Sequence, residues 1–137
     1  MENLDKIMKE LKKTGMKQTP QRIEVVRALL KLKEKHPTLN QVYNEAKKKV
    51  PTLSFSTLYT IVKKLEELGV IKLFDLLGET RIEVNNKPHI NIIDLSNGEI
   101  DDYNDDSLVK EIVEETGLDR SDFVLINILV YKEKTSK

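Results

Sequence analysis

The spacing of the apolar residues changes near Gly69, and this change constrains the fold more than any other feature. Before Gly69, apolar side chains recur every three or four residues, as in amphipathic helices. Four such runs begin near Leu4, Thr19, Thr38 and Ser54. After Gly69, two strand-like segments, 70–76 and 80–84, flank a turn at Gly78. Three or four helices followed by a hairpin predict a winged helix-turn-helix.

Capping residues mark where the helices begin. Thr19 precedes Pro20, which is favourable in a first helical turn because the N–H group there has no partner in the helix. Thr38 is followed three residues later by Gln41, the spacing of a capping box. The fourth run is expected to bury one face, made of Phe55, Leu58, Val62, Leu65 and Leu68. Such a helix suits DNA recognition, because its apolar face stays on the domain while hydrogen-bonding side chains point outward.

The second half of the chain predicts a small α/β domain. Segments 90–95 and 99–103 flank Ser96-Asn97-Gly98, a strong signal for a hairpin turn. Residues 106–116 predict a helix with Leu108, Ile112 and Val113 inward. The last segment, 123–131, is apolar on both alternations, which favours a strand covered on both faces. A domain of about 50 residues buries little surface alone, so a second copy of the chain is a plausible cover.

Charge is divided unequally between the two halves. Residues 1–73 contain 16 Lys or Arg and eight Asp or Glu, a net charge of about +8, whereas the remaining 64 residues carry about −8. This asymmetry suggests a module that faces a polyanion joined to an acidic one.

Several classes of protein are not expected. The longest apolar runs are too short to cross a bilayer, and the N-terminus has no secretory signal. The chain has no cysteine, which excludes disulfides and thiolate metal sites. The sequence also lacks the HExxH, nucleophile-elbow and phosphate-loop motifs of common enzymes. We therefore expect a cytoplasmic protein that is not an enzyme and has no membrane partner.

Several segments together resemble the ferric uptake regulator (Fur) family over roughly residues 10–131. These are 11–22 (LKKTGMKQTPQR), 36–38 (HPT) with Val42-Tyr43, 53–59 (LSFSTLY), 87–89 (KPH), 97–100 (NGEI) and the final strand. The resemblance implies an α+β architecture, with a winged helix-turn-helix DNA-binding domain over 1–85 and an α/β dimerisation domain over 86–137. It also implies a transcription regulator, expected to repress, that binds an inverted repeat in double-stranded DNA as a homodimer.

The resemblance assigns three residues to DNA contact. It implies that Tyr59 contacts thymine and backbone in the major groove, that Lys17 approaches an AT-rich minor groove, and that Arg22 contacts phosphate. Thr60 departs from the family, which usually has an arginine at that position. Threonine cannot make the bidentate contact of an arginine, so we expect a different base preference or a lower affinity.

Four further residues of the predicted recognition helix are candidates for DNA contact by their chemistry. Ser56 and Thr57 lie near the helix start, where hydroxyl groups and the helix dipole favour phosphate. Lys63 and Lys64 are general phosphate partners, although solvated surface lysines would look the same in the sequence.

The resemblance also concerns metal. Family members carry a structural zinc on two CxxC motifs, but here the first pair falls on Asp94 and Asn97, and no cysteine exists for the second. We therefore expect no structural zinc. A second family site needs histidines where this chain has Asp122 and Phe123, which leaves one sensory site.

The resemblance places the ligands of that sensory site at His36, Glu83, His89, Asn91 and Asp102. Two imidazoles and two carboxylates suit Fe²⁺, Mn²⁺ or Zn²⁺. Asn91 replaces a histidine and is a weak donor, so the affinity falls or the selectivity shifts towards harder ions. Both histidines also have structural interpretations: His36 precedes Pro37 at a helix entry, and His89 is compatible with a solvated strand.

Two alternatives remain open. The first is a Fur-fold regulator that works without metal, which the missing cysteines favour. The second is a winged-helix protein used for protein–protein contact, which Thr60 and the acidic second half favour.

Overall fold

The computed structural model describes residues 4–84, 88–119 and 124–133. The chain forms two compact units, 1–86 and 87–137, and each has its own apolar core. The boundary expected from the sequence, after residue 85, lies one residue earlier. Asp122 and Phe123, which stand where a second family metal site would need histidines, lie outside the described residues.

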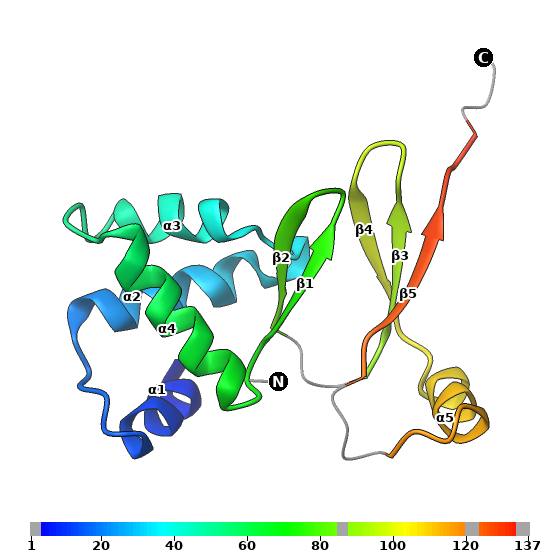
Figure 1. The fold of residues 1–137 in the computed structure, drawn as a ribbon, viewed down its shortest axis with the longest axis horizontal. Coiled ribbons are helices and arrows are strands. Elements are labelled where there is room, and N and C mark those ends of the chain that lie inside the picture. Colours follow the sequence, from blue (N-terminus) through cyan, green and yellow to red (C-terminus); the bar gives the residue numbers. More distant parts are fainter. Residues whose placement is uncertain (1–3, 85–87, 120–123, 134–137) are drawn as a thin grey trace. The chain divides into compact units, whose positions relative to one another are not determined.

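Helices come first in the chain and the wing hairpin follows them (Figure 1). The elements of the first unit are α1 (Leu4–Lys13), α2 (Pro20–Leu32), the short 3₁₀ helix η1 (Lys33–Lys35), α3 (Leu39–Lys47), α4 (Phe55–Glu67), β1 (Lys72–Leu76) and β2 (Glu79–Glu83). This order confirms the predicted winged helix-turn-helix. Among the described residues, every helix is too short or too polar to span a bilayer.

Side-chain caps fix where three of these helices begin. The Thr19 hydroxyl accepts from the Arg22 N–H at 3.3 Å, and the Ser54 hydroxyl caps α4 in the same way. At α3 the predicted capping box is confirmed, because the Gln41 N–H donates to the Thr38 hydroxyl and the Thr38 N–H donates to the Gln41 side chain. Each cap satisfies backbone groups that a helix start leaves without partners.

The core of the first unit is built on one face of α4. The buried residues of α4 are Leu58, Ile61, Val62 and Leu65, at the i, i+3, i+4, i+7 spacing of a helix face. The prediction was wrong about Phe55, which is 40% exposed. Its position in the first turn takes it past the core, and its ring packs edge-on against Tyr43 with centroids 5.5 Å apart.

The wing hairpin closes through a two-residue turn at Leu77 and Gly78. Leu76 and Glu79 are register partners, and both turn residues have positive φ angles, 52° and 82°. Two positive φ angles define the type I′ turn, whose twist matches that of the strands it connects. Glycine adopts this conformation at no steric cost, but in leucine the Cβ crowds the backbone.

The second unit contains a three-stranded sheet and one helix. Its elements are β3 (Ile90–Asp94), β4 (Glu99–Tyr103), α5 (Asp106–Glu115) and β5 (Ile126–Val130). The strand order is β4-β3-β5, with β3 antiparallel to β4 and parallel to β5. The predicted helix exists, but it buries Val109 and Val113, while Leu108 is 38% exposed. The prediction that Leu108 points inward was therefore wrong. The buried face of α5 begins one residue later, at Val109.

Strand β5 lies at an edge of this sheet and keeps apolar side chains exposed. Ile128 is 49% exposed, Leu129 56%, and Tyr131 just after the strand 72%. Cover on both faces was predicted for this strand, and the described residues of a single chain do not provide it.

We predict that Leu77→Asn stabilises the protein. Asparagine tolerates the left-handed conformation far better than leucine, so the free energy of unfolding should rise by about 1 kcal/mol. Urea titration followed by circular dichroism measures the change. Leu77→Ala is the matched control, because alanine keeps the Cβ clash and loses only the exposed side chain. Equal stabilities of the two variants would contradict the turn argument.

Candidate nucleic-acid interface and metal ligands

The outward face of α4 carries hydrogen-bonding side chains. Ser56 and Thr60 are exposed, and Tyr59 is 45% exposed. The spacing of these residues places them on neighbouring turns, away from the buried face. A helix that enters the major groove needs this distribution, because its base contacts come from the side opposite the core.

Hydroxyl groups at the start of α4 also bond to one another. The Ser54 hydroxyl donates to the Thr57 hydroxyl at 2.9 Å while it accepts from the Thr57 N–H. The Thr60 hydroxyl donates to the backbone carbonyl of Ser56 at 2.9 Å. The oxygen of Thr60 can still accept a hydrogen bond, but its donor is used within the helix. Thr60 therefore offers neither the reach nor the donors of an arginine.

Lys63 and Lys64 are both engaged in ion pairs along α4. The Lys63 Nζ atom lies 2.8 Å from Glu66, and the Lys64 Nζ atom lies 3.1 Å from Glu67. The hydrogen bond to Glu66 raises the pKa of Lys63, and the same contact lowers the pKa of Glu66. Glu66 also accepts from the Leu73 N–H at 3.2 Å, which joins α4 to the wing. In this arrangement both lysines present less positive charge than the sequence suggests.

Lys17 and Arg22 lie together at the segment that connects α1 to α2. The Arg22 guanidinium donates to the Lys17 carbonyl at 2.9 Å, while the Lys17 side chain is exposed. Arg22 thus positions the backbone that carries Lys17.

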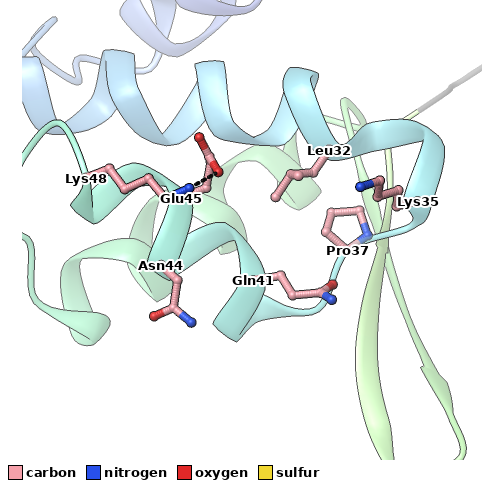
Figure 2. Close-up of a pocket in the computed structure, with 7 residues that line it drawn as sticks. All are labelled: Leu32, Lys35, Pro37, Gln41, Asn44, Glu45 and Lys48. Atoms are coloured by element: carbon pink, nitrogen blue, oxygen red, sulfur yellow. Dashed lines mark hydrogen bonds and ion pairs between the residues drawn. The ribbon is translucent and has the colours of Figure 1, made fainter.

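A pocket in the first unit lies apart from the predicted DNA-contact residues. It is lined by Leu32, Lys35, Pro37, Gln41, Asn44, Glu45 and Lys48 (Figure 2). Glu45 pairs with Lys48 at 3.1 Å, as the figure shows, and with Lys31 at 2.8 Å. These two lysines lower the pKa of Glu45 and give this surface mixed charge.

His36 and Glu83 form a buried pair in the first unit. Their side chains are 1% and 2% exposed, and His36 Nε2 lies 3.4 Å from Glu83 Oε1. Two ligand atoms at about 2.1 Å from a tetrahedral ion lie about 3.4 Å apart, so this separation suits two ligands of one cation.

The backbone at His36 is held in a left-handed conformation, with φ 49° and ψ 66°. The His36 carbonyl accepts from the Arg81 guanidinium at 3.2 Å, and the Pro37 carbonyl accepts from the Ile82 N–H at 2.9 Å. These bonds tie the entry of α3 to β2, the strand that ends with Glu83. His36 is therefore both a residue that shapes the entry of α3, as its structural interpretation expected, and the partner of Glu83.

The second unit pairs His89 with Asp102. The side chains are 4% and 24% exposed, and His89 Nε2 lies 3.5 Å from Asp102 Oδ1. The alternative interpretation of His89 as a solvated strand residue is therefore wrong. Asn91 is buried, and it is the register partner of Asp102 in the β3–β4 pair. Each unit thus contains one imidazole–carboxylate pair from the predicted ligand set.

The positions implied for the first zinc motif have a different use here. Asp94 accepts from the Ser96 N–H at 2.9 Å and from the Ser96 hydroxyl at 2.6 Å, which lowers the pKa of Asp94. The Asn97 side chain accepts from the Glu99 N–H at 2.9 Å. Both residues bond within the β3–β4 turn.

Two contacts at these sites were missed from the sequence. The Asn91 amide donates to the Asn127 side chain at 3.0 Å, and Glu66 bonds to the Leu73 backbone. The apolar setting of Asn127 between Ile126 and Ile128 was the available signal for the first. The bond between Glu66 and Leu73 had no signal in the sequence, because it depends on where the wing returns to α4.

The fold and the polar outward face of α4 are those of a winged-helix DNA-binding protein. The model of the ferric uptake regulator family matches residues 13–130. This chain belongs to that family.

The known proteins that are similar to this chain support its membership of the family. A ferric uptake regulation protein homolog of Archaeoglobus fulgidus is 43% identical over 113 residues, which cover 82% of this chain and 87% of that protein. The ferric uptake regulation protein of Bacillus subtilis is 33% identical over 122 residues, covering 83% and 82%. The structure of Helicobacter pylori Fur has a TM-score of 0.75 at 25% identity and covers 96% and 93%.

We predict that Glu66→Gln destabilises the protein at neutral pH. The pKa of Glu66 is lowered in the folded state, so its charge contributes stability above its unfolded pKa, and this contribution is lost as pH falls through the folded pKa. The loss at pH 7 should be about 1 kcal/mol, because a charged hydrogen bond is removed.

Urea unfolding at several pH values measures this effect, and Glu67→Gln is the control. Glu67 makes only an exposed pair with Lys64, so its substitution should cost no more than about 0.5 kcal/mol. If the two variants lost equal stability, or if the Glu66→Gln difference did not shrink as the pH was lowered, the assigned role of Glu66 would be wrong.

Proposed function

We propose that this protein is a cytoplasmic repressor that binds an inverted repeat in double-stranded DNA as a homodimer, under the control of one divalent metal ion. The observation that carries the proposal is the outward face of α4, where Tyr59, Ser56 and Thr60 are exposed opposite a buried apolar face. Family membership supports the same function.

The charge and the position of individual residues support specific DNA contacts. Tyr59 is assigned to the major groove, with Ser56, Thr57 and Thr60 beside it. Lys17 is assigned to a minor groove and Arg22 to a phosphate near it. Lys63 and Lys64 are assigned to phosphates, which would compete with their glutamate partners for the ammonium groups. Phosphate contacts of this kind make binding strongly dependent on salt.

The second unit supports a homodimer. Its fully buried apolar residues are few among those described, Ile90, Ile93, Val109 and Val113. Edge strand β5 exposes Ile128 and Leu129 in addition. A second copy that covers these residues removes apolar surface from water and completes a small core. Two-fold symmetry of the dimer then calls for an inverted repeat in the operator.

The metal is assigned to His36, Glu83, His89 and Asp102, with Asn91 as a weaker ligand. The donor types fit Fe²⁺, Mn²⁺ or Zn²⁺, and each imidazole–carboxylate pair has a separation suited to two ligands of one cation. Five residues lie between Glu83 and His89, so their Cα atoms are six steps apart along the chain and at most about 21 Å from each other. The similar protein Helicobacter pylori Fur, whose structure reveals three functional metal binding sites, adds support.

The ligand residues account for control by metal because they come from both units. His36 and Glu83 belong to the DNA-binding unit, and His89 and Asp102 belong to the other. A bound ion would supply coordination bonds that limit the freedom of one unit relative to the other. Only some arrangements of two winged helices match successive major grooves, so restricting that freedom favours the DNA-bound state.

We predict that Tyr59→Ala weakens DNA binding about 5- to 150-fold, because a base contact is worth about 1–3 kcal/mol. Fluorescence anisotropy with a duplex from the region upstream of its own coding sequence measures this at low salt. Tyr103→Ala is the matched control, since Tyr103 is 47% exposed but lies in the second unit. Lys17→Ala should reduce the slope of log affinity against log salt by about 1, whereas Lys110→Ala should leave it unchanged.

A different result would favour the protein–protein alternative. If the purified protein stayed monomeric by sedimentation and bound no duplex at low salt, the DNA-binding proposal would fail. Equal losses for Tyr59→Ala and Tyr103→Ala would remove α4 as the recognition helix.

We further predict that chelation weakens DNA binding at least about fivefold and that Mn²⁺ restores it, as expected for a typical coupling between sites. His36→Asn and His89→Asn should abolish the restoration. Asparagine at position 36 preserves the left-handed backbone, so this variant should remain folded. Metal analysis reports whether the ion is bound, fluorescence anisotropy reports whether it changes the affinity for DNA, and thermal melts report whether each variant is folded. Affinity unchanged by the chelator would instead establish the metal-independent regulator.

A further inference from the structure

A row of polar side chains crosses the sheet of the second unit at Asn91. The register places Asn91 opposite Asp102 on β4 and opposite Asn127 on β5. Register partners in neighbouring strands project from the same face of a sheet. The row therefore begins at Asp102, which pairs with His89, and ends at Asn127 on the edge strand.

Asn127 orients the buried amide of Asn91. Asn91 is 1% exposed, and its Nδ2 atom donates to Asn127 Oδ1 at 3.0 Å. Because the two heteroatoms of an amide diverge from Cγ, a nitrogen directed at Asn127 leaves the oxygen directed away from β5. Strand β3 lies between β5 and β4, so the Asn91 oxygen faces the side on which Asp102 and His89 are paired.

We propose that Asn127 is a positioning residue that presents the Asn91 carbonyl oxygen as a metal ligand and so favours Mn²⁺ over Zn²⁺. This inference rests on the metal control proposed above. Zn²⁺ prefers four ligands, the number that the two imidazole–carboxylate pairs of the proposed site would supply. Mn²⁺ prefers six ligands rich in oxygen, so a fifth oxygen donor stabilises it more than it stabilises Zn²⁺.

Affinities of the purified full-length protein for Mn²⁺ and Zn²⁺, measured by competition with a metal-binding dye, test the proposal. Asn127→Ala should lower the affinity for Mn²⁺ about tenfold, the usual effect of losing a residue that orients a ligand, with a smaller effect on Zn²⁺. Asn127→Asp retains an acceptor for the Asn91 amide, so the ratio of the two affinities should stay near that of the wild type. Its added charge raises both affinities, which is why the ratio is the readout.

Two further variants sharpen the test. Asn91→His replaces the oxygen donor with nitrogen and should shift the ratio towards Zn²⁺ by about tenfold or more. Asn104→Ala removes an exposed amide just after β4 and should change neither affinity. Thermal melts show whether each variant is folded, and the Asn127→Asp result distinguishes orientation of Asn91 from a general loss of structure.

The outcomes separate this inference from the proposed function. Suppose that the wild type binds Mn²⁺ while Asn127→Ala lowers the affinities for Mn²⁺ and Zn²⁺ equally or leaves both unchanged. In that case the role proposed for Asn127 is wrong and the proposed metal control stands. An Asn127→Asp ratio that matches Asn127→Ala would also overturn it. If the wild type binds neither ion, the proposed metal control fails and this inference fails with it.

Discussion

The packing of one face of α4 on the core determines the rest of the DNA-facing surface. Leu58, Ile61, Val62 and Leu65 are nearly inaccessible to water, and together they allow α4 only one rotation about its axis. A helix turns about 100° per residue, so a shift of one position would bury Tyr59 and expose an apolar residue. The bond from the Leu73 N–H to Glu66 then joins the wing to this helix. Local capping and global packing agree here, as expected of a sequence with one favoured structure.

The helix order and the two hairpins could be predicted from the sequence because their signals are local. Caps such as Thr38 with Gln41, and turns such as the one that ends at Gly98, depend on neighbouring residues alone. The details that were missed depend on where the core ends. Phe55 continues the apolar spacing of α4 but lies beyond the core, and Leu108 loses its buried place to Val109 because α5 packs with a slightly different rotation.

The candidate sites were predictable to different extents. His36 and Glu83 are 47 positions apart in the sequence, so spacing alone gave no reason to pair them, and only the resemblance to the family did. The contact between Asn91 and Asn127 depends on the parallel pairing of β3 with β5 across a helix. A single sequence does not specify which strands become neighbours after such a crossover. The exposed face of α4, in contrast, followed from periodicity.

The left-handed backbone at His36 has a consequence for how such a regulator can diverge. Asparagine, aspartate and glycine accept that conformation readily, while β-branched and bulky residues do not. Glu83 ends a strand, and its extended backbone conformation is open to a much wider range of residues. In a lineage that no longer responds to metal, substitutions should therefore accumulate at the carboxylate before the imidazole. If a relative keeps the histidine at this position but has lost the glutamate, the histidine would then be retained for its backbone conformation and not for metal binding.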